Sequence, residues 1–261
     1  MDPITIELNK PVLQVKDLTV VRSGKVIIEN VSLDIKQGEF IGIVGPNGSG
    51  KSTLLLSILG VLKSQKGTVK IYDYPPMSRG LNGKIGWVSQ AASNLPKEIR
   101  ITVEELVKLG TFNAKNMLQR MSKIRSKMAD DAIEMVGLQD QKNTDVSKLS
   151  GGQRQRAVIA RALASNADFL LLDEPLVGID RDAKNSLLKL LDDLCHNQGK
   201  TILMVSHDLS AIMQTSHRMI YLEQNIKYDG PADAFPSLEE IAKLRGLKNV
   251  HDGHKHSEES E

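Results

Sequence analysis

Nine consecutive residues combine glycines with a lysine and hydroxyl side chains, a set that can bind phosphate. They are Gly45, Pro46, Asn47, Gly48, Ser49, Gly50, Lys51, Ser52 and Thr53. The glycines allow a tight turn whose backbone N–H groups converge on an anion. In such a loop Lys51 would reach the β- and γ-phosphates of a nucleotide, and the Ser52 hydroxyl would hold Mg²⁺. The spacing therefore predicts a phosphate-binding loop.

The residues on either side of this loop favour the same interpretation. The apolar run Phe40–Val44 predicts a strand before it, and the leucine-rich run after Lys51 predicts a helix that ends near Gly60. A strand and a helix are the context that this motif requires, and the helix N-terminus adds positive potential. A glycine-rich turn that fits the pattern by chance is the alternative, and it is disfavoured by these flanks.

Two carboxylates follow a second apolar run. Asp173 and Glu174 come directly after Phe169–Leu172, which predicts a buried strand. Ligands of open α/β sheets bind beyond the carboxyl ends of the strands, so both side chains are expected near the loop. Asp173 would hold Mg²⁺, and Glu174 would polarise a water that attacks the γ-phosphate. An Asp-Glu pair that caps the next helix is the alternative.

A histidine follows a third apolar run, Thr201–Val205. We expect His207 at the same edge of the sheet, in reach of the γ-phosphate or of Glu174. A single histidine is more often structural, but the end of a buried strand favours a functional role. His196 and His217 have no such position, and we assign them none.

The composition limits the classes of function. The chain has 261 residues, of which 40% are hydrophobic, and it has the composition of a globular protein of one or two domains. A net charge of +2 and 3% aromatic residues disfavour nucleic-acid binding. Cys195 is the only cysteine, so an intrachain disulfide is excluded, and a small, half-buried helix residue is its expected role. No apolar run approaches the ~20 residues that span a bilayer, and we expect neither a signal peptide nor a membrane role without a partner.

The remaining segments predict an alternation of strands and helices. Further strands are expected at residues 12–20, 26–28, 31–35, 67–72 and 84–88, and after residue 201 helix and strand are expected to alternate to about Tyr228. Residues from about Ala91 to Val146 read as a helical insertion, in which Thr102 and Glu105 form a capping box. Its apolar stripe is expected to be mainly core, with a minority of positions free to face a partner.

Taken in order, these motifs resemble those of the ATPase subunit of an ABC transporter. Besides the loop, the chain has a switch glutamine at Gln90, the signature Leu149–Gln153, the strand end Asp173–Pro175, a loop ending at Asp180, and the switch histidine His207. The resemblance covers the chain up to about Gly230. It implies an α/β fold, a P-loop NTPase (RecA-like) core with an antiparallel β subdomain and an inserted α-helical subdomain.

The resemblance also implies domain boundaries and site residues. Residues 1–90 would form the first part of the ATP-binding core, 91–150 the helical subdomain, 151–230 the second part of the core, and 231–261 a C-terminal extension. Glu174, His207 and Gln90 would be catalytic, and Ser52, Gln90 and Asp173 would hold Mg²⁺. Residues that bind the ATP of a second copy would be Ser150, Gly151, Gly152 and Gln153.

The implied system has several partners. Two copies would pair head to tail, on the cytoplasmic face of the membrane, with an integral-membrane permease and an extracytoplasmic metal-binding protein. Residues 173–180 and 203–209 look most like those of zinc and manganese importers. His251, His254 and His256 in the C-terminal tail suit zinc, although a solvated polar tail explains them equally well. Another cargo, such as an iron chelate or a lipid, and a soluble ABC ATPase without a permease are the alternatives.

One position departs from the family pattern. The family usually has an aromatic residue that stacks on adenine after the first strand, and here that position is Arg22. A guanidinium can also stack on a ring, so Arg22 is the candidate for this contact.

Overall fold

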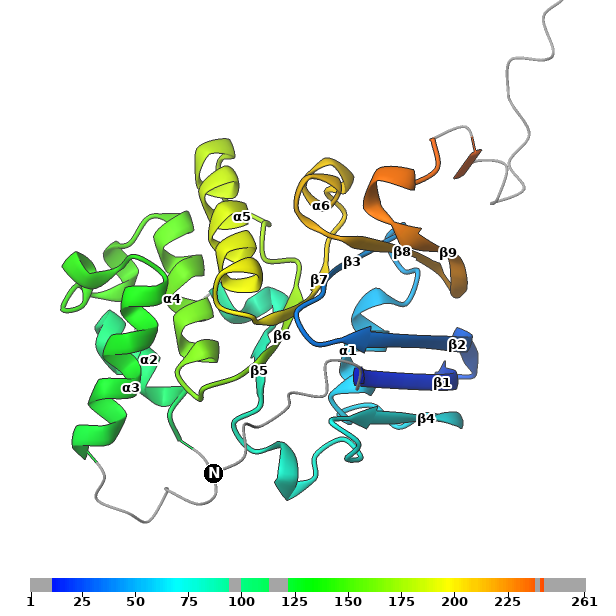
Figure 1. The fold of residues 1–261 in the computed structure, drawn as a ribbon, viewed down its shortest axis with the longest axis horizontal. Helices are drawn as coiled ribbons and strands as arrows, with labels where there is room; N and C mark the ends of the chain where they lie inside the picture. The colour runs from blue at the N-terminus through cyan, green and yellow to red at the C-terminus, as the bar shows by residue number, and fades with distance from the viewer. Residues whose placement is uncertain (1–10, 94–99, 113–121, 238–239, 242–261) are drawn as a thin grey trace, which may run out of the picture.

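The computed structural model describes residues 11–93, 100–112, 122–237 and 240–241, which form two β-sheets with helices around them (Figure 1). The first sheet is antiparallel, with the order β2-β1-β4. Its strands are β1 (Pro11–Arg22), β2 (Lys25–Lys36) and β4 (Lys66–Ile71). The structure thus confirms the predicted antiparallel β sheet.

The second sheet has six strands in the order β5-β6-β7-β3-β8-β9. They are β5 (Ile85–Val88), β6 (Phe169–Asp173), β7 (Thr201–Val205), β3 (Phe40–Val44), β8 (Arg218–Glu223) and β9 (Asn225–Pro231). All neighbouring pairs are parallel except β8 and β9. Every residue of β3, β6 and β7 is buried, as their continuous apolar runs predict for strands that are covered on both faces.

These central strands divide their side chains between two hydrophobic cores. On β3, Phe40 and Val44 belong to one core, whereas Ile41 and Ile43 belong to the other. Alternate strand residues point to opposite faces, so a continuous apolar strand supplies both cores. The first core also contains the helices α2 to α6, and the second lies against α1 and the antiparallel sheet.

In the described ranges, six α-helices surround the sheets, together with short 3₁₀ turns. The α-helices are α1 (Lys51–Ile58), α2 (Val103–Leu109), α3 (Ser122–Met135), α4 (Gly151–Leu163), α5 (Arg181–His196) and α6 (Leu209–Thr215). The 3₁₀ turns are η1 (Arg79–Leu81), η2 (Gln90–Ser93), η3 (Gln139–Gln141), η4 (Val146–Lys148) and η5 (Ala232–Ala234). Helices α2, α3 and α4 pack together at one end of the molecule, on the left in Figure 1.

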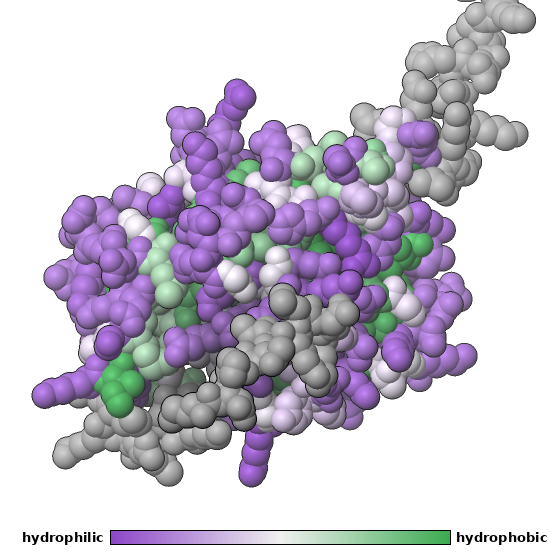
Figure 2. Space-filling view, in the orientation of Figure 1, coloured by the Kyte–Doolittle hydropathy of each residue, from purple (hydrophilic) through white to green (hydrophobic). Residues whose placement is uncertain are grey.

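Helix α2, in the predicted helical insertion, has the capping box that the sequence predicts. The Thr102 hydroxyl accepts the Glu105 N–H at 3.2 Å, and the Thr102 N–H donates to the Glu105 carboxylate at 2.8 Å. The Glu105 carboxylate accepts both the Thr102 N–H and, at 3.0 Å, the Thr102 hydroxyl, and these two hydrogen bonds lower the pKa of Glu105. The apolar stripe of α3 is only partly core, because Ile133 is buried whereas Ile124 is 52% exposed. Figure 2 shows a mainly hydrophilic face with a small hydrophobic patch near the lower end of α3.

Two predicted segments are wrong. The two strands expected at 26–28 and 31–35 are one strand, β2, which stays continuous because Asn30 takes a φ of 51° and its N–H donates to the Thr19 hydroxyl. The alternation of helix and strand does not continue to Tyr228, because β8 turns back through Gln224, with φ 59°, into the antiparallel strand β9. A left-handed residue makes each of these irregularities possible.

No helix in the ranges that the structure describes has the length and apolar character needed to cross a membrane.

The centre of β3 leaves no room for a side chain at Gly42. A Cβ atom there would lie 2.1 Å from Cγ2 of Ile212 on α6. We therefore expect Gly42→Ala to lower the free energy of unfolding by about 1–3 kcal/mol, measured by urea denaturation. In the double variant with Ile212→Ala the cost should fall well below the sum of the two single costs. Additive costs would show that this contact does not limit the packing.

Candidate functional site

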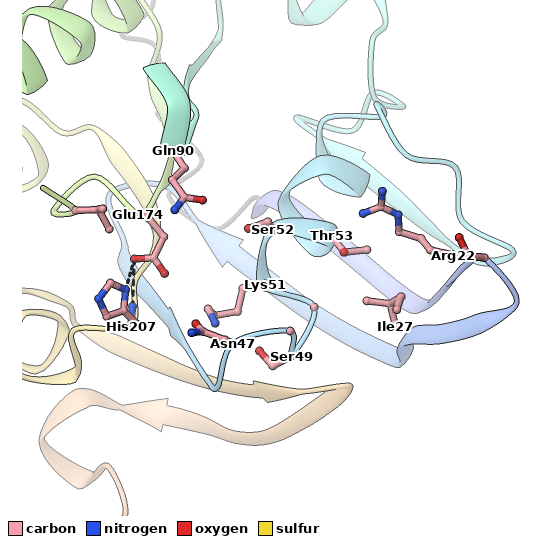
Figure 3. Close-up of a pocket in the computed structure, with 14 residues that line it drawn as sticks. Arg22, Ile27, Asn47, Ser49, Lys51, Ser52, Thr53, Gln90, Glu174 and His207 are labelled. Carbon is pink, nitrogen blue, oxygen red and sulfur yellow. Dashed lines mark hydrogen bonds and ion pairs between the residues drawn. The ribbon is translucent and has the colours of Figure 1, made fainter. Parts of the chain in front are cut away.

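A cavity of about 720 Å³ lies at the glycine-rich loop that follows β3 (Figure 3). Its wall is made of residues that are far apart in the sequence. They are Arg22, Ser23, Ile27, Asn47, Gly48, Ser49, Gly50, Lys51, Ser52, Thr53, Gln90, Glu174, Val177 and His207. Most of the predicted loop residues therefore line the cavity, together with the predicted Gln90, Glu174 and His207.

The loop conformation depends on glycine where the backbone passes close to β8. Gly45 has a φ of 156°, and a Cβ atom there would lie 2.1 Å from the Leu222 carbonyl oxygen. At the other end Gly50, with φ 102°, immediately precedes α1. The Ser49 hydroxyl between them is buried and has no hydrogen-bond partner among the residues that the structure describes. A buried polar group without a partner is costly, so this hydroxyl fits a site that receives a polar ligand.

Lys51 places a positive charge inside the loop. Its ammonium donates hydrogen bonds to the carbonyl oxygens of Gly45, at 2.8 Å, and Pro46, at 2.9 Å. Burial lowers the pKa of Lys51, while the charges of Glu174 and Asp173 oppose that shift. Gly45 and Pro46 thus contact the Lys51 ammonium through their carbonyl groups and are not among the residues that line the cavity.

Ser52 and Asp173 bring two oxygen ligands together at the start of α1. The Ser52 hydroxyl donates to Asp173 Oδ1 at 3.2 Å. Burial raises the pKa of Asp173, and the hydrogen bond from Ser52 opposes this shift. Hydroxyl and carboxylate oxygens are the ligands that Mg²⁺ prefers, so the pair fits a magnesium ion beside a bound phosphate.

Glu174 and His207 form the other end of the cavity. Glu174 Oε2 lies 2.8 Å from His207 Nδ1 and accepts the backbone N–H of His207 at 3.3 Å. Because a carboxylate only accepts, this geometry assigns the Nδ1 proton to His207. Glu174 has a φ of 53°, a left-handed conformation that is uncommon for a residue other than glycine. Such strained residues cluster at functional sites.

The two ends of the cavity differ in character. In Figure 3 Glu174 and His207 lie at one end, Lys51 and Ser52 in the middle, and Arg22 and Ile27 at the other. Ser23, Ile27 and Val177 also line the cavity and were not predicted. Ile27 is half buried, between exposed Val26 and buried Ile28 on β2, and only the fold brings it close to the loop.

The predicted signature residues lie apart from the cavity of their own chain. Ser150, Gly151, Gly152 and Gln153 are not among its lining residues. The Ser150 hydroxyl accepts the Gln153 N–H at 3.2 Å, so Ser150 caps α4 and its exposed N-terminus faces outward. Gly152 is buried against α5, where a Cβ atom would lie 2.6 Å from Cβ of Ala183.

Comparison with known proteins identifies this arrangement. The ABC transporter family model matches residues 28–177. A zinc uptake system ATP-binding protein from Listeria monocytogenes is 34% identical over 87% of this chain and 88% of its own length. A manganese transport system ATP-binding protein from the same species is 38% identical over 88% of this chain and 94% of its own length.

A solved structure shows the same fold with nucleotide products. It is an ATP-binding cassette determined as a dimer with bound ADP and Pi, and it superposes with a TM-score of 0.70, 32% identity, and coverage of 85% of this chain and 100% of the other. Family, fold and cavity agree, and we conclude that this chain belongs to the ABC transporter family, as one of its ATPase subunits.

Proposed function

We propose that this ATPase energises the import of a divalent metal ion, zinc or manganese, through a partner permease. The observation that carries the proposal is the similarity, over most of the chain, to ATP-binding proteins of zinc uptake and manganese transport systems. The zinc-system relative is 34% identical to this chain and the manganese-system relative is 38% identical. These two identities are similar, so the proposal names both metals.

The geometry of the cavity supports a definite chemical mechanism. The backbone N–H groups of Asn47 to Thr53 and the Lys51 ammonium bind the β- and γ-phosphates of ATP. Ser52 and Asp173, with Gln90, would hold Mg²⁺, which neutralises the developing phosphate charge. Glu174 accepts a proton from the attacking water while the water oxygen bonds to the γ-phosphorus. The bond between the γ-phosphorus and the bridging oxygen then breaks, and ADP leaves with that oxygen. The contact with His207 holds the Glu174 carboxylate in position.

A second copy of the chain completes the site. The exposed start of α4 lies outside the cavity of its own chain. Its capping box uses the N–H groups of Ser150 and Gln153, which leaves those of Gly151 and Gly152 available to a γ-phosphate on another subunit. The dimeric cassette with bound ADP and Pi supports this pairing. Ser150, Gly151, Gly152 and Gln153 are the residues that would make the contact.

A groove beside α2 supports a permease as the membrane partner. It has a volume of about 350 Å³, and its wall includes Trp87, Leu109, Phe112 and Arg161. Leu109 and Phe112 are 55% and 49% exposed and line the same groove, so together they offer an apolar surface to a partner. Strand β5 connects this groove to Gln90. The helical subdomain, residues 91–150, would thus dock on the cytoplasmic face of a permease that receives metal from an extracytoplasmic binding protein.

The role assigned to Glu174 predicts a separation of binding from hydrolysis. We expect Glu174→Gln to bind ATP and form a dimer, but to hydrolyse ATP about 10²–10⁴-fold more slowly, because the amide cannot accept the proton. Lys51→Ala is the matched control, which should lose nucleotide binding itself. Nucleotide affinity, dimerisation by light scattering and phosphate release distinguish the two variants. Wild-type turnover by Glu174→Gln would exclude Glu174 as the base.

The position of Arg22 predicts an effect on nucleotide affinity alone. Arg22 and Ile27 line the end of the cavity away from Glu174, where the adenine would lie. We expect Arg22→Tyr to tighten ATP binding, because an aromatic ring offers a full stacking face. Calorimetric titration with a non-hydrolysable ATP analogue measures the effect. An unchanged dissociation constant would count against a base contact at this position.

The cargo is tested by growth of a strain that lacks this gene. In medium depleted by a chelator, we expect growth to be restored by zinc or manganese added alone, and by a plasmid copy of the wild-type gene, but not by the Lys51→Ala gene. Rescue by iron alone, or normal growth without any addition, would contradict the proposed cargo and leave the ATPase assignment intact.

A further inference from the structure

Away from the ATP cavity, three side chains with metal-binding atoms lie together. Cys195 and His196 end α5, and His217 immediately precedes β8. The ligand atoms of these three residues lie within 4.8 Å of one another. The Nε2 atoms of the two histidines are only 2.9 Å apart, with their rings edge to face.

Asp192 holds His196 in the form that a metal requires. Its carboxylate Oδ1 lies 3.0 Å from His196 Nδ1, and its carbonyl oxygen lies 3.1 Å from the same atom. Both partners are acceptors, so the Nδ1 atom carries the proton and the Nε2 lone pair points toward His217. A carboxylate behind a metal-binding imidazole is the usual second shell of zinc sites.

Cys195 supplies the third ligand from the buried side of the cluster. It is 3% exposed, and its thiol contacts the Gly38 carbonyl oxygen at 3.3 Å. Its sulfur is the donor in this contact, so the thiol carries a proton in the absence of a cation. One sulfur and two imidazole nitrogens form a ligand set that suits Zn²⁺ and related transition metals rather than Mg²⁺.

We propose that Cys195, His196 and His217 bind one divalent cation of the zinc class, with water in the fourth position. In a tetrahedral zinc site the bond lengths place the ligand atoms roughly 3.3–3.8 Å apart. The two histidine nitrogens are closer together than this, at 2.9 Å, and all three ligand atoms lie within 4.8 Å of one another. The His196 side chain is 49% exposed, so its ring is free to make the small shift that closes the site.

Binding requires a definite transfer of protons. The metal–sulfur bond forms as the thiol proton leaves to solvent. His217 Nδ1 accepts the Phe40 N–H at 3.0 Å, so the proton of this imidazole is on Nε2, which donates it to His196 Nε2 at 2.9 Å. A metal at Nε2 moves that proton to Nδ1, and the Phe40 N–H loses its acceptor. The metal therefore competes with a hydrogen bond at the first residue of β3, the strand that leads to the phosphate loop.

The test is a Co²⁺ titration of the full chain carrying His251→Asn, His254→Asn and His256→Asn, which removes the histidines of the tail as competing ligands. We expect one equivalent of Co²⁺ to produce tetrahedral visible absorption and a thiolate charge-transfer band that Zn²⁺ abolishes. Cys195→Ala should remove the charge-transfer band. Because His196 is half exposed, His196→Ala should keep the fold and lower the affinity by more than about tenfold.

Two further variants complete the design. Asp192→Asn should weaken binding by about 10–100-fold, as expected for a second-shell partner. Asp182→Asn, at the other end of α5, is the matched control and should change nothing. Absence of the cobalt spectrum, or a spectrum that survives Cys195→Ala, would overturn the proposal. Neither result would affect the ATPase proposal, because the ATP cavity is lined by none of these residues.

Discussion

The compensation of one buried positive charge governs the whole site. Lys51 is only 7% exposed, and an ammonium group that has lost water needs anions or carbonyl groups around it. Here the carbonyl oxygens of Gly45 and Pro46 contact it, and the charges of Asp173 and Glu174 act on it from the end of β6. In the proposed mechanism the triphosphate of ATP would replace these partners with stronger ones. Without a nucleotide, the Lys51 ammonium is held by the carbonyl oxygens of the loop itself.

The fold meets this requirement by ending three buried strands at one edge. Phe40–Val44 leads to the loop, Phe169–Asp173 to the two carboxylates, and Thr201–Val205 to His207. Each strand is fixed on both faces by a separate hydrophobic core, so the polar groups at its end have little freedom to move. Side chains on such strand ends are positioned by packing, whereas Gln90 and the start of α4 are exposed.

Features with local causes could be read from the sequence, and features made by distant contacts could not. The phosphate loop, the three buried strands and the capping box of Thr102 each depend on a few adjacent residues, and all were predicted. The lining role of Ile27 and the pairing of His196 with His217 depend on residues that meet only in the folded chain. The continuity of β2 and the β8–β9 hairpin were missed because a single left-handed residue decides each. The residue type alone does not reveal a left-handed conformation unless the residue is glycine.

The left-handed backbone of Glu174 has an evolutionary consequence. At a φ of 53° branched side chains are strongly disfavoured, whereas glycine and aspartate are accommodated easily. Both are one nucleotide change away from a glutamate codon. Glycine removes the carboxylate and aspartate shortens its reach, yet both relax the backbone. Because Glu174 is the base in the proposed mechanism, a change to either residue would give a folded subunit that no longer hydrolyses ATP. An intact fold in a descendant lineage would then be no evidence of ATPase activity.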